Sequence, residues 1–266
     1  MSEAIKFEVK EGIATLVLNS PETRNAITGR EMIDGIIRAC DTVNEDMDIR
    51  VMIITGADPA FSSGGNIKDM AAKKGMFSGG SMQLMENYRN NVQRIPLAVH
   101  NVSVPTIAAV NGPAIGAGCD LACMCDMRIA SEKARFGETF LAVGLIPGDG
   151  GAYFLPRIIG MARACELTFT ARVIDAAKAL EYGLVNSVTP HESLMDAAYE
   201  LAREIASKPG PALRMAKRLL YAGRESSLET LLEQSAAYQA LCHQSDDHME
   251  ALSAIFEKRK PAFSGK

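Results

Sequence analysis

Residues 109–120 read Ala-Val-Asn-Gly-Pro-Ala-Ile-Gly-Ala-Gly-Cys-Asp, which is an apolar strand followed by a glycine-spaced turn and the start of a helix. Gly116 and Gly118 carry no side chain, so the main chain there can approach a ligand closely. The free amides and positive dipole end of a helix N-terminus favour developing negative charge. Asp120 lies in the first helical turn, beside those amides. The stretch therefore predicts an oxyanion hole with a carboxylate next to it.

Strand patterns lie on the N-terminal side of this stretch. Residues 7–17 alternate between apolar and polar about Glu11-Gly12, which predicts a β-hairpin. Residues 51–55 and 106–110 are apolar runs of strand length. Helical patterns separate these runs, so the sequence predicts an α/β architecture with a site at the carboxyl ends of its strands.

Helix signals are present as well. Thr28 and Glu31 have the spacing of a capping box ahead of an apolar helical pattern. The polar, Gly- and Ser-rich residues 71–81 predict a loop, and residues 82–94 predict a helix. From about Pro190 onward only helices are predicted, at 190–207, 209–222 and 228–258. A helical module without a sheet of its own often packs on a neighbour, so we expect oligomers.

Composition excludes several classes of function. The 266-residue chain is 47% hydrophobic and 23% charged, as in a globular protein with one substantial domain or one domain and an appendage. Its net charge of −4 gives no basic field for nucleic acid or an anionic membrane. No apolar run reaches the about 18 residues of a membrane span, and we expect no export signal.

The cysteines point to a reduced environment. Six cysteines follow no regular disulfide framework, and several lie in apolar periodic segments. Cys123-x-Cys125 is not a zinc spacing and has no second pair to complete one. We therefore expect a cytoplasmic protein without a metal.

Motifs along nearly the whole chain resemble the enoyl-CoA hydratase/isomerase superfamily, also called crotonases. The matching stretches are Arg24-Asn25-Ala26, residues 60–68, residues 111–130, residues 136–151 and the tail 256–263. The resemblance implies a spiral of β-β-α units over residues 1–195, and a helical region over 196–266 that builds trimers or hexamers of two trimers. It also implies an acyl-CoA thioester as substrate and no bound cofactor.

The resemblance assigns roles to individual residues. It implies that the amides of Gly65 and Ala117 hold the thioester carbonyl as it becomes an enolate. It implies that residues 71–81 form a lid near the acyl chain. The residues that it implies for CoA binding are Arg24, Ala26, Ser63, Gly65, Ile67 and, from a neighbouring subunit, Lys258.

The chain departs from the family pattern at the catalytic acids. Hydratases of this family typically hold a water between two glutamates, and this chain has Asp120 and Phe140 at those places. Asp149 is one candidate for the missing acid, although it is also placed to cap the helix that begins near Gly150. Glu138 is a weaker candidate, which would share a face with Phe140 if that stretch is a strand. Asp120 could equally serve to cap its own helix.

Three functions remain open on these residues. The leading one is hydration of a 2-enoyl-CoA, with Asp120 and Asp149 moving protons. The second is double-bond isomerisation of a 3-enoyl- or dienoyl-CoA, for which one carboxylate is enough and Phe140, as part of the acyl pocket, is no handicap. The third, of another class, is a weakly catalytic CoA-binding or RNA-binding protein, against which the acidic net charge argues as far as RNA is concerned.

Overall fold

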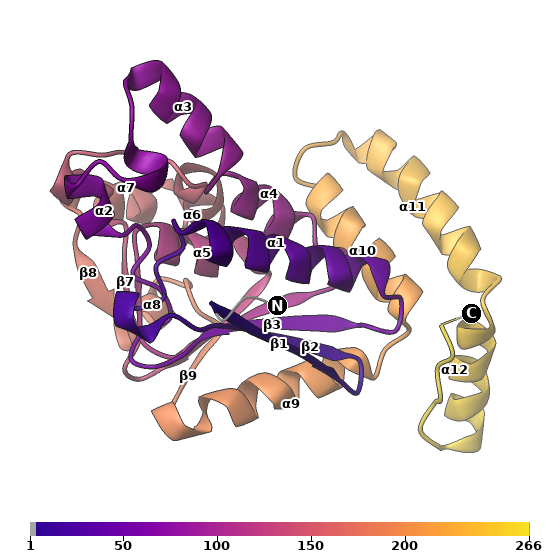
Figure 1. Cartoon of the computed structure of the whole chain (residues 1–266). Coiled ribbons are helices and arrows are strands. Elements are labelled where there is room, and N and C mark those ends of the chain that lie inside the picture. The colour runs from indigo at the N-terminus through magenta and orange to yellow at the C-terminus, as the bar shows by residue number, and fades with distance from the viewer. Residues whose placement is uncertain (1–3, 266) are drawn as a thin grey trace.

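A computed structural model describes residues 4–265 of the chain. Within these residues, the strands form a six-stranded sheet of order β1-β2-β3-β4-β6-β9 and a three-stranded sheet of order β5-β7-β8 (Figure 1). The strands are β1 (Ile5–Lys10), β2 (Ile13–Leu18), β3 (Val51–Gly56), β4 (Thr106–Val110), β5 (Pro113–Ile115), β6 (Met127–Ser131), β7 (Arg135–Gly137), β8 (Val173–Asp175) and β9 (Ser187–Thr189). The helices are α1 (Arg30–Glu45), α2 (Ile67–Ala71), α3 (Ser81–Asn90), α4 (Arg94–His100), α5 (Ala117–Met124), α6 (Gly151–Ile159), α7 (Met161–Thr170), α8 (Ala176–Glu181), α9 (Leu194–Ala206), α10 (Gly210–Ala222), α11 (Leu228–His243) and α12 (Asp246–Glu257), with 3-10 turns η1 (Pro21–Thr23), η2 (Gly75–Phe77), η3 (Thr139–Val143) and η4 (His191–Ser193).

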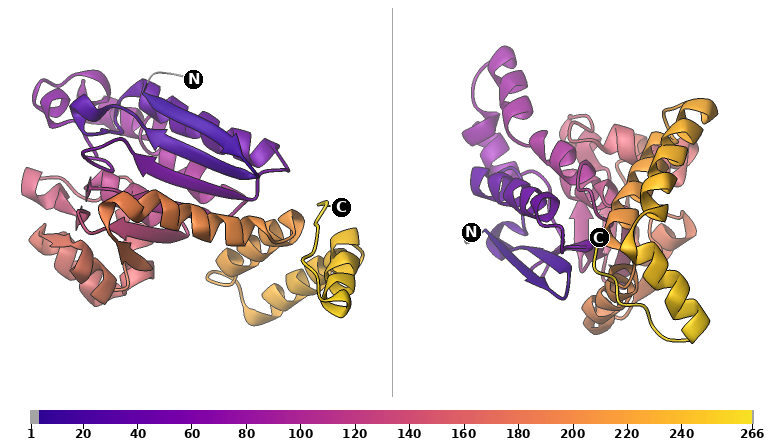
Figure 2. Two further views of the ribbon diagram at one scale, coloured as in Figure 1. Left: turned by 90° about the horizontal axis from the view of Figure 1, so that it is seen from below. Right: turned by 90° about the vertical axis from the view of Figure 1, so that its right-hand side faces the viewer.

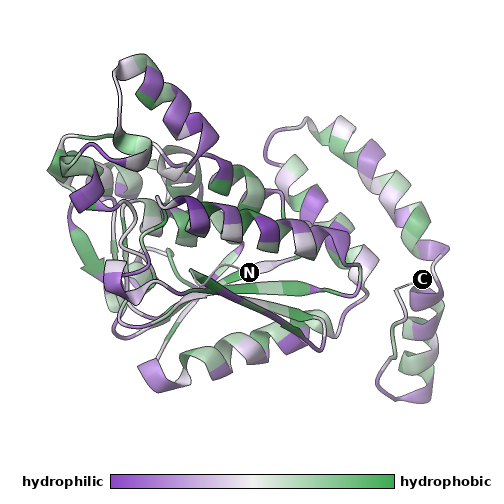
Figure 3. Cartoon of the chain, viewed as in Figure 1, coloured by the Kyte–Doolittle hydropathy of each residue, from purple (hydrophilic) through white to green (hydrophobic). Residues whose placement is uncertain are grey.

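The larger sheet is covered by helices on both faces. Strand β3 is buried along its whole length, and its side chains alternate between two cores. Met52 and Ile54 join the core under α1, whereas Val51 and Ile53 join a smaller core under α9. Figure 1 shows α1 and α9 on opposite sides of this sheet, and Figure 3 shows the apolar colouring of its central strands. The continuous apolar run at 51–55 is therefore a strand buried on both faces.

The α/β architecture expected from the sequence is confirmed. Strands β1 and β2 pair antiparallel about Glu11 and Gly12, which both have positive φ, and β2, β3, β4, β6 and β9 then pair parallel in that order. Strand β4 leads through Asn111 to β5 and so to the smaller sheet. The amide of Ser62 donates to the Pro113 carbonyl over 3.1 Å, which joins the loop after β3 to β5.

Three local expectations were wrong in detail. Helix α1 begins at Arg30 with Gly29 as its N-cap, because the Thr28 hydroxyl instead accepts a hydrogen bond from the Asn66 amide. The predicted helix over 82–94 ends at Asn90 with α3, and a second helix, α4, begins at Arg94 after a turn. The predicted loop at 71–81 contains η2, and Asn87 of α3 donates to the Met76 carbonyl.

Helices end the chain, as predicted, but the pattern at 228–258 is broken at Ser245, which caps α12. Helix α9 crosses position 195, where a boundary between two units is predicted, and packs on the larger sheet. Figures 1 and 2 show α11 and α12 standing away from the body of the molecule. Among residues 4–265, no helix combines the length and apolarity that crossing a bilayer requires.

Candidate active site

Two segments distant in sequence form one wall of the candidate site. The amide of Ser63 donates to the Arg24 carbonyl over 2.8 Å, and the amide of Ile27 donates to the Gly64 carbonyl over 2.9 Å. Arg24 and Asn25 both have positive φ, which turns the chain toward the second segment. The cavity between the segments has a volume of about 460 Å³ and is lined by Glu22, Thr23, Arg24, Ser63, Gly65, Asn66, Ile67 and Lys68.

Most of the residues predicted for CoA binding surround this cavity. Arg24, Ser63, Gly65 and Ile67 line it. Ala26 is buried and is not among the lining residues. Lys258 ends α12, and Figure 1 shows that helix at the far side of the same chain from α2, which follows the cavity loop. One chain therefore brings four of these residues together and leaves Lys258 apart from them.

The two predicted oxyanion amides lie on loops that touch through their backbones. A Cβ atom on Gly64, which has φ +75°, would lie 2.9 Å from the Ala117 nitrogen. A Cβ atom on Gly118 would lie 2.2 Å from the Ser62 carbonyl oxygen. Only glycine permits this approach, and it brings Gly65 beside the start of α5. The amide of Asp120 is the first in α5 to reach a helical acceptor, the Gly116 carbonyl, so the Ala117 amide before it is one of the orphan donors.

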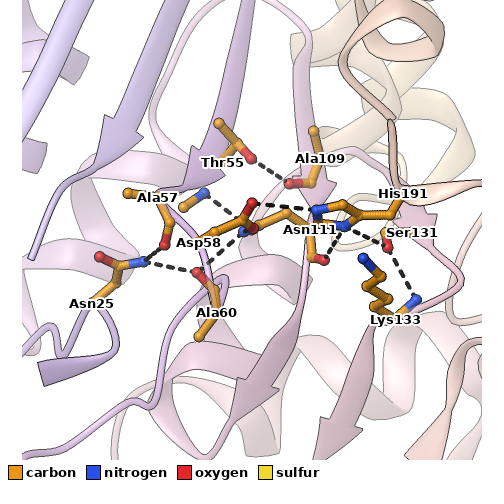
Figure 4. A network of polar contacts seen from close by, with 11 residues as sticks. Asn25, Thr55, Ala57, Asp58, Ala60, Ala109, Asn111, Ser131, Lys133 and His191 are labelled. Atoms are coloured by element: carbon orange, nitrogen blue, oxygen red, sulfur yellow. Dashed lines mark hydrogen bonds and ion pairs between the residues drawn. The ribbon is translucent and has the colours of Figure 1, made fainter. Parts of the chain in front are cut away.

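A network of polar contacts joins the loop after β3 to Asn25 and to the end of β4 (Figure 4). The Asn25 side-chain amide donates to the carbonyls of Ala57 and Ala60, each over 2.7 Å. The Asn111 side-chain amide donates to Asp58 over 2.8 Å. These bonds tie residues 57–60, the start of the loop that carries Gly65, to Asn25 and to Asn111 after β4.

His191 extends this network toward the C-terminal half of the chain. Its Nε2 lies 3.2 Å from an Asp58 carboxylate oxygen, and its Nδ1 lies 3.1 Å from both the Ser131 hydroxyl and the Asn111 carbonyl (Figure 4). The sequence reasoning missed Asn25 and His191 as supports. Asn25 could have been found from the sequence, because it is a polar residue inside a motif that resembles the family. The sequence around His191 contains no pattern that would indicate its role.

Three acids converge beside the oxyanion turn. Asp120, Glu138 and Asp149 are exposed by only 0%, 1% and 5%. Helix α6 passes so close that a Cβ atom on Gly151 would lie 2.2 Å from Asp120 Oδ1 and 3.0 Å from Glu138 Oε2. Among residues 4–265, no donor makes a hydrogen bond of normal geometry to either oxygen of Asp120 or Glu138, or to Oδ1 of Asp149.

The alternative capping roles do not fit this geometry. The N-cap of α6 is Gly150, and no side chain caps that helix, so Asp149 is not its cap. Asp120 has no hydrogen bond of normal geometry to the amides of its helix. The prediction that Glu138 shares a face with Phe140 was wrong, because η3 begins directly after Glu138. Glu138 is buried against α5, while Phe140 is half-buried near Gly116.

Burial shifts all three acids toward their protonated forms. It raises the pKa of Asp120 well above its usual range, and the charge of Glu138 raises it further, which the nearby Gly151 amide opposes only in part. Burial raises the pKa of Glu138 to about 7 and that of Asp149 to about 6. Acids shifted toward neutrality in a closed pocket are suited to proton transfer.

A mainly apolar cavity lies beside the turn that carries Asp149. It has a volume of about 510 Å³ and is lined by Ile67, Met70, Ala71, Lys73, Phe77, Gly79, Leu84, Tyr88, Val143 and Leu145. Ile67 lines both cavities, so they are neighbours. Burial and then the charge of Asp149 raise the pKa of Tyr88, whose ring lies beside Gly148. The cavity thus reaches the turn that carries Asp149.

Comparisons with known proteins agree with this fold. The profile of the enoyl-CoA hydratase/isomerase family matches residues 8–266. The chain is 34% identical to a crotonyl-CoA hydratase from Syntrophomonas wolfei over 99% of each chain, and 35% identical to a 1,2-epoxyphenylacetyl-CoA isomerase from Escherichia coli over the full length of both. The crystal structure of an enoyl-CoA hydratase from Bacillus anthracis superposes with a TM-score of 0.92 at 33% identity, covering 99% of this chain and 100% of that one.

Proposed function

The chain belongs to the enoyl-CoA hydratase/isomerase family, and from this premise we propose that it adds water to a 2-enoyl-CoA. The observation that carries the proposal is the position of Asp120 and Asp149. Both are buried and lack a protein donor at Oδ1, and the charge of Asp149 reaches Asp120. A general acid and a general base are therefore both available, although Phe140 stands where hydratases of this family have their second glutamate.

The substrate is held by backbone groups. We place the CoA moiety along the cavity lined by Arg24, Ser63 and Ile67, and the acyl chain in the apolar cavity beyond Ile67. The thioester carbonyl then accepts hydrogen bonds from the amides of Gly65 and Ala117. Negative charge develops on this oxygen during the reaction, and one such donor is typically worth about 3–4 kcal/mol of the barrier. No cofactor is needed for this chemistry.

The two acids are assigned by their pKa values. At neutral pH Asp149, with a pKa of about 6, is ionised and takes a proton from water as the water oxygen bonds to C3. Asp120, whose pKa is raised well above its usual range by burial and by the charge of Glu138, is assigned as the acid that gives its proton to C2 as the enolate collapses. Transfer of a proton from Asp149 back to Asp120 restores the starting state.

Double-bond isomerisation is the second candidate, and one observation favours it. The aromatic ring of Phe140 lies near Gly116 at the oxyanion turn, with its Cζ 3.8 Å from where a Cβ atom would be on that glycine. A phenyl ring cannot hold a water or move a proton there. A single acid that removes a proton at one carbon and returns it at another would suffice.

Turnover in oxygen-18 water separates the two candidates. The purified protein is given a medium-chain 2-enoyl-CoA and its 3-enoyl isomer, and the products are followed by mass spectrometry and NMR. We expect label in a 3-hydroxyacyl-CoA. Interconversion of the two enoyl isomers without incorporation of label would show that the protein is an isomerase and not a hydratase. Tight acyl-CoA binding without turnover of either would favour the non-catalytic alternative.

A further inference from the structure

Glu138 is the one member of the acid cluster that the proposed reaction does not use. It lies between β7 and η3 and is almost completely buried. Within residues 4–265, no Lys, Arg or His forms an ion pair with it, and neither carboxylate oxygen has a hydrogen bond of normal geometry. An ionised carboxylate left in this state costs several kcal/mol, on the order given for isolated buried charges.

Asp120 is a carboxyl neighbour of Glu138. Both carboxyl groups crowd the Cα of Gly151, where an added Cβ atom would lie 2.2 Å from Asp120 Oδ1 and 3.0 Å from Glu138 Oε2. Two ionised carboxylates side by side repel each other, and each offers only acceptors. A proton on one of them removes the repulsion and supplies the missing donor.

We propose that Glu138 is a positioning residue that shares one proton with Asp120 beside Gly151, so that the pair holds the proton that Asp120 delivers to substrate. This inference rests on the function proposed for Asp120. Glu138 itself touches neither substrate nor reacting atoms in this scheme. It keeps Asp120 protonated at neutral pH and fixes the direction in which the carboxyl group points.

The other groups around the pair do not compete for this role. Cys119 and Cys123 face it from α5, and Asp149 faces it from the turn before α6. The pKa of the Cys119 thiol is raised well above its usual value, so this group stays neutral and is only a weak donor. Asp149 adds negative charge, which also favours retention of the shared proton.

A carbon-13 NMR titration of the resting protein tests the pair. Side-chain carboxyl carbons of Asp and Glu are labelled, and Asp120→Asn identifies the Asp120 signal. In Glu138→Gln the repulsion is gone and an amide donor faces Asp120, so its titration midpoint should fall by about one pH unit or more, within the range seen for close charge pairs. The matched control is Glu132→Gln, an exposed site in the loop before β7, which should leave the midpoint unchanged.

The reciprocal variant makes the test independent of one substitution. In Asp120→Ala the hydrogen bond from Asp120, which lowers the pKa of Glu138, is lost while the burial of Glu138 remains, so the midpoint of Glu138 should rise above about 7. An unchanged Asp120 midpoint in Glu138→Gln, or an unchanged Glu138 midpoint in Asp120→Ala, overturns the proposal. So does failure of Glu138→Gln to fold, because its amide offers the donor that the pair needs.

Kinetics separate this proposal from the function on which it rests. In Glu138→Gln the alkaline limb of kcat should move to lower pH, since Asp120 loses its proton earlier, while KM stays within about twofold. A merely structural role for Glu138 lowers kcat without moving that limb. If the Asp120 midpoint shifts in the NMR titration but the protein turns over no enoyl-CoA, the proposed function is wrong and the shared proton is supported. If the protein hydrates 2-enoyl-CoA but the Asp120 midpoint does not shift, the shared proton is wrong and the proposed function is supported.

Discussion

Asp149 is the residue whose environment bears most directly on the reaction, because burial alone raises its pKa to about 6. We expect Asp149→Asn and Asp120→Asn each to lower kcat for hydration by about 10²–10⁴-fold, the usual contribution of a positioned acid or base. Steady-state kinetics on a 2-enoyl-CoA measure this loss. A full loss in one variant and near-normal activity in the other would instead indicate a single-acid isomerase.

The pH dependence of activity follows from the pKa of Asp149. The base must be ionised, so kcat should fall as the pH drops below about 6 and Asp149 takes up a proton. A pH–rate profile of the wild-type protein measures this acid limb. A limb near the ordinary Asp value of 3.8 would show that another group is the base.

The buried acid also affects folding stability. The folded pKa of Asp149, about 6, lies above the unfolded value of 3.8, so between these pH values the folded protein binds more protons. Rising pH through this window therefore lowers the free energy of unfolding. We expect Asp149→Asn to raise Tm by about 3 °C or more above pH 7, an effect of about 1 kcal/mol for a chain of this size, and the gain to shrink toward pH 4. An unchanged Tm across this range would mean that burial does not destabilise the ionised form of Asp149.

At the scale of elements, the contact between the loop after β3 and the start of α5 depends on missing side chains. In Gly118→Ala the added methyl would meet the Ser62 carbonyl oxygen at 2.2 Å. This oxygen belongs to the backbone, and a Cβ atom is fixed by its own backbone, so neither can rotate away. We expect the two oxyanion amides to separate, with kcat/KM falling by about 10²-fold or more, the typical loss of one such donor.

Gly210→Ala in α10 is the matched control for this variant. Its added methyl has no neighbour closer than 3.8 Å, so activity and Tm should stay close to those of the wild type. Kinetics and thermal unfolding of both variants check the comparison. Wild-type activity in Gly118→Ala would mean that the close approach of the two loops does not set the oxyanion site.

At the scale of the whole molecule, α11 and α12 present apolar side chains that their own chain does not cover. In the single chain Phe256 is 81% exposed and Leu228 is 70% exposed, and Figure 3 shows hydrophobic colouring along both helices. A patch of this kind usually marks a contact with another protein. We expect these helices to join copies of the chain into trimers, or hexamers, that bring Lys258 to a neighbour's CoA cavity.

Sedimentation at micromolar concentration measures the assembly. A trimer or hexamer is the expected result, and Phe256→Glu should shift it toward monomers while raising the KM for acyl-CoA. Lys258→Ala should raise the KM without changing the assembly. A protein that sediments only as a monomer would rule out both the trimer and the intersubunit role of Lys258.

The sequence by itself determined the local elements and the glycine turn. Alternation about Glu11-Gly12 and the buried run at 51–55 are short-range patterns, so they specify the hairpin and β3 without knowledge of the rest of the chain. The motifs also located the cavity residues Arg24, Ser63 and Ile67, because these lie within matched stretches. The predicted N-cap at Thr28 was wrong for the opposite reason. The Asn66 amide, which donates a hydrogen bond to the Thr28 hydroxyl, is distant in sequence.

Only the tertiary structure decided how the acids are arranged. Asp120, Glu138 and Asp149 come from α5, from the residue before η3 and from the turn before α6, and no local pattern relates them. Packing of α6 at Gly151 brings the first two together and excludes water from all three. The pKa of a carboxyl group depends on desolvation and on neighbouring charges, which are properties of the packed chain. The sequence therefore named the candidate acids, and the fold determined that all three are buried and that Asp120 and Glu138 both lie against Gly151.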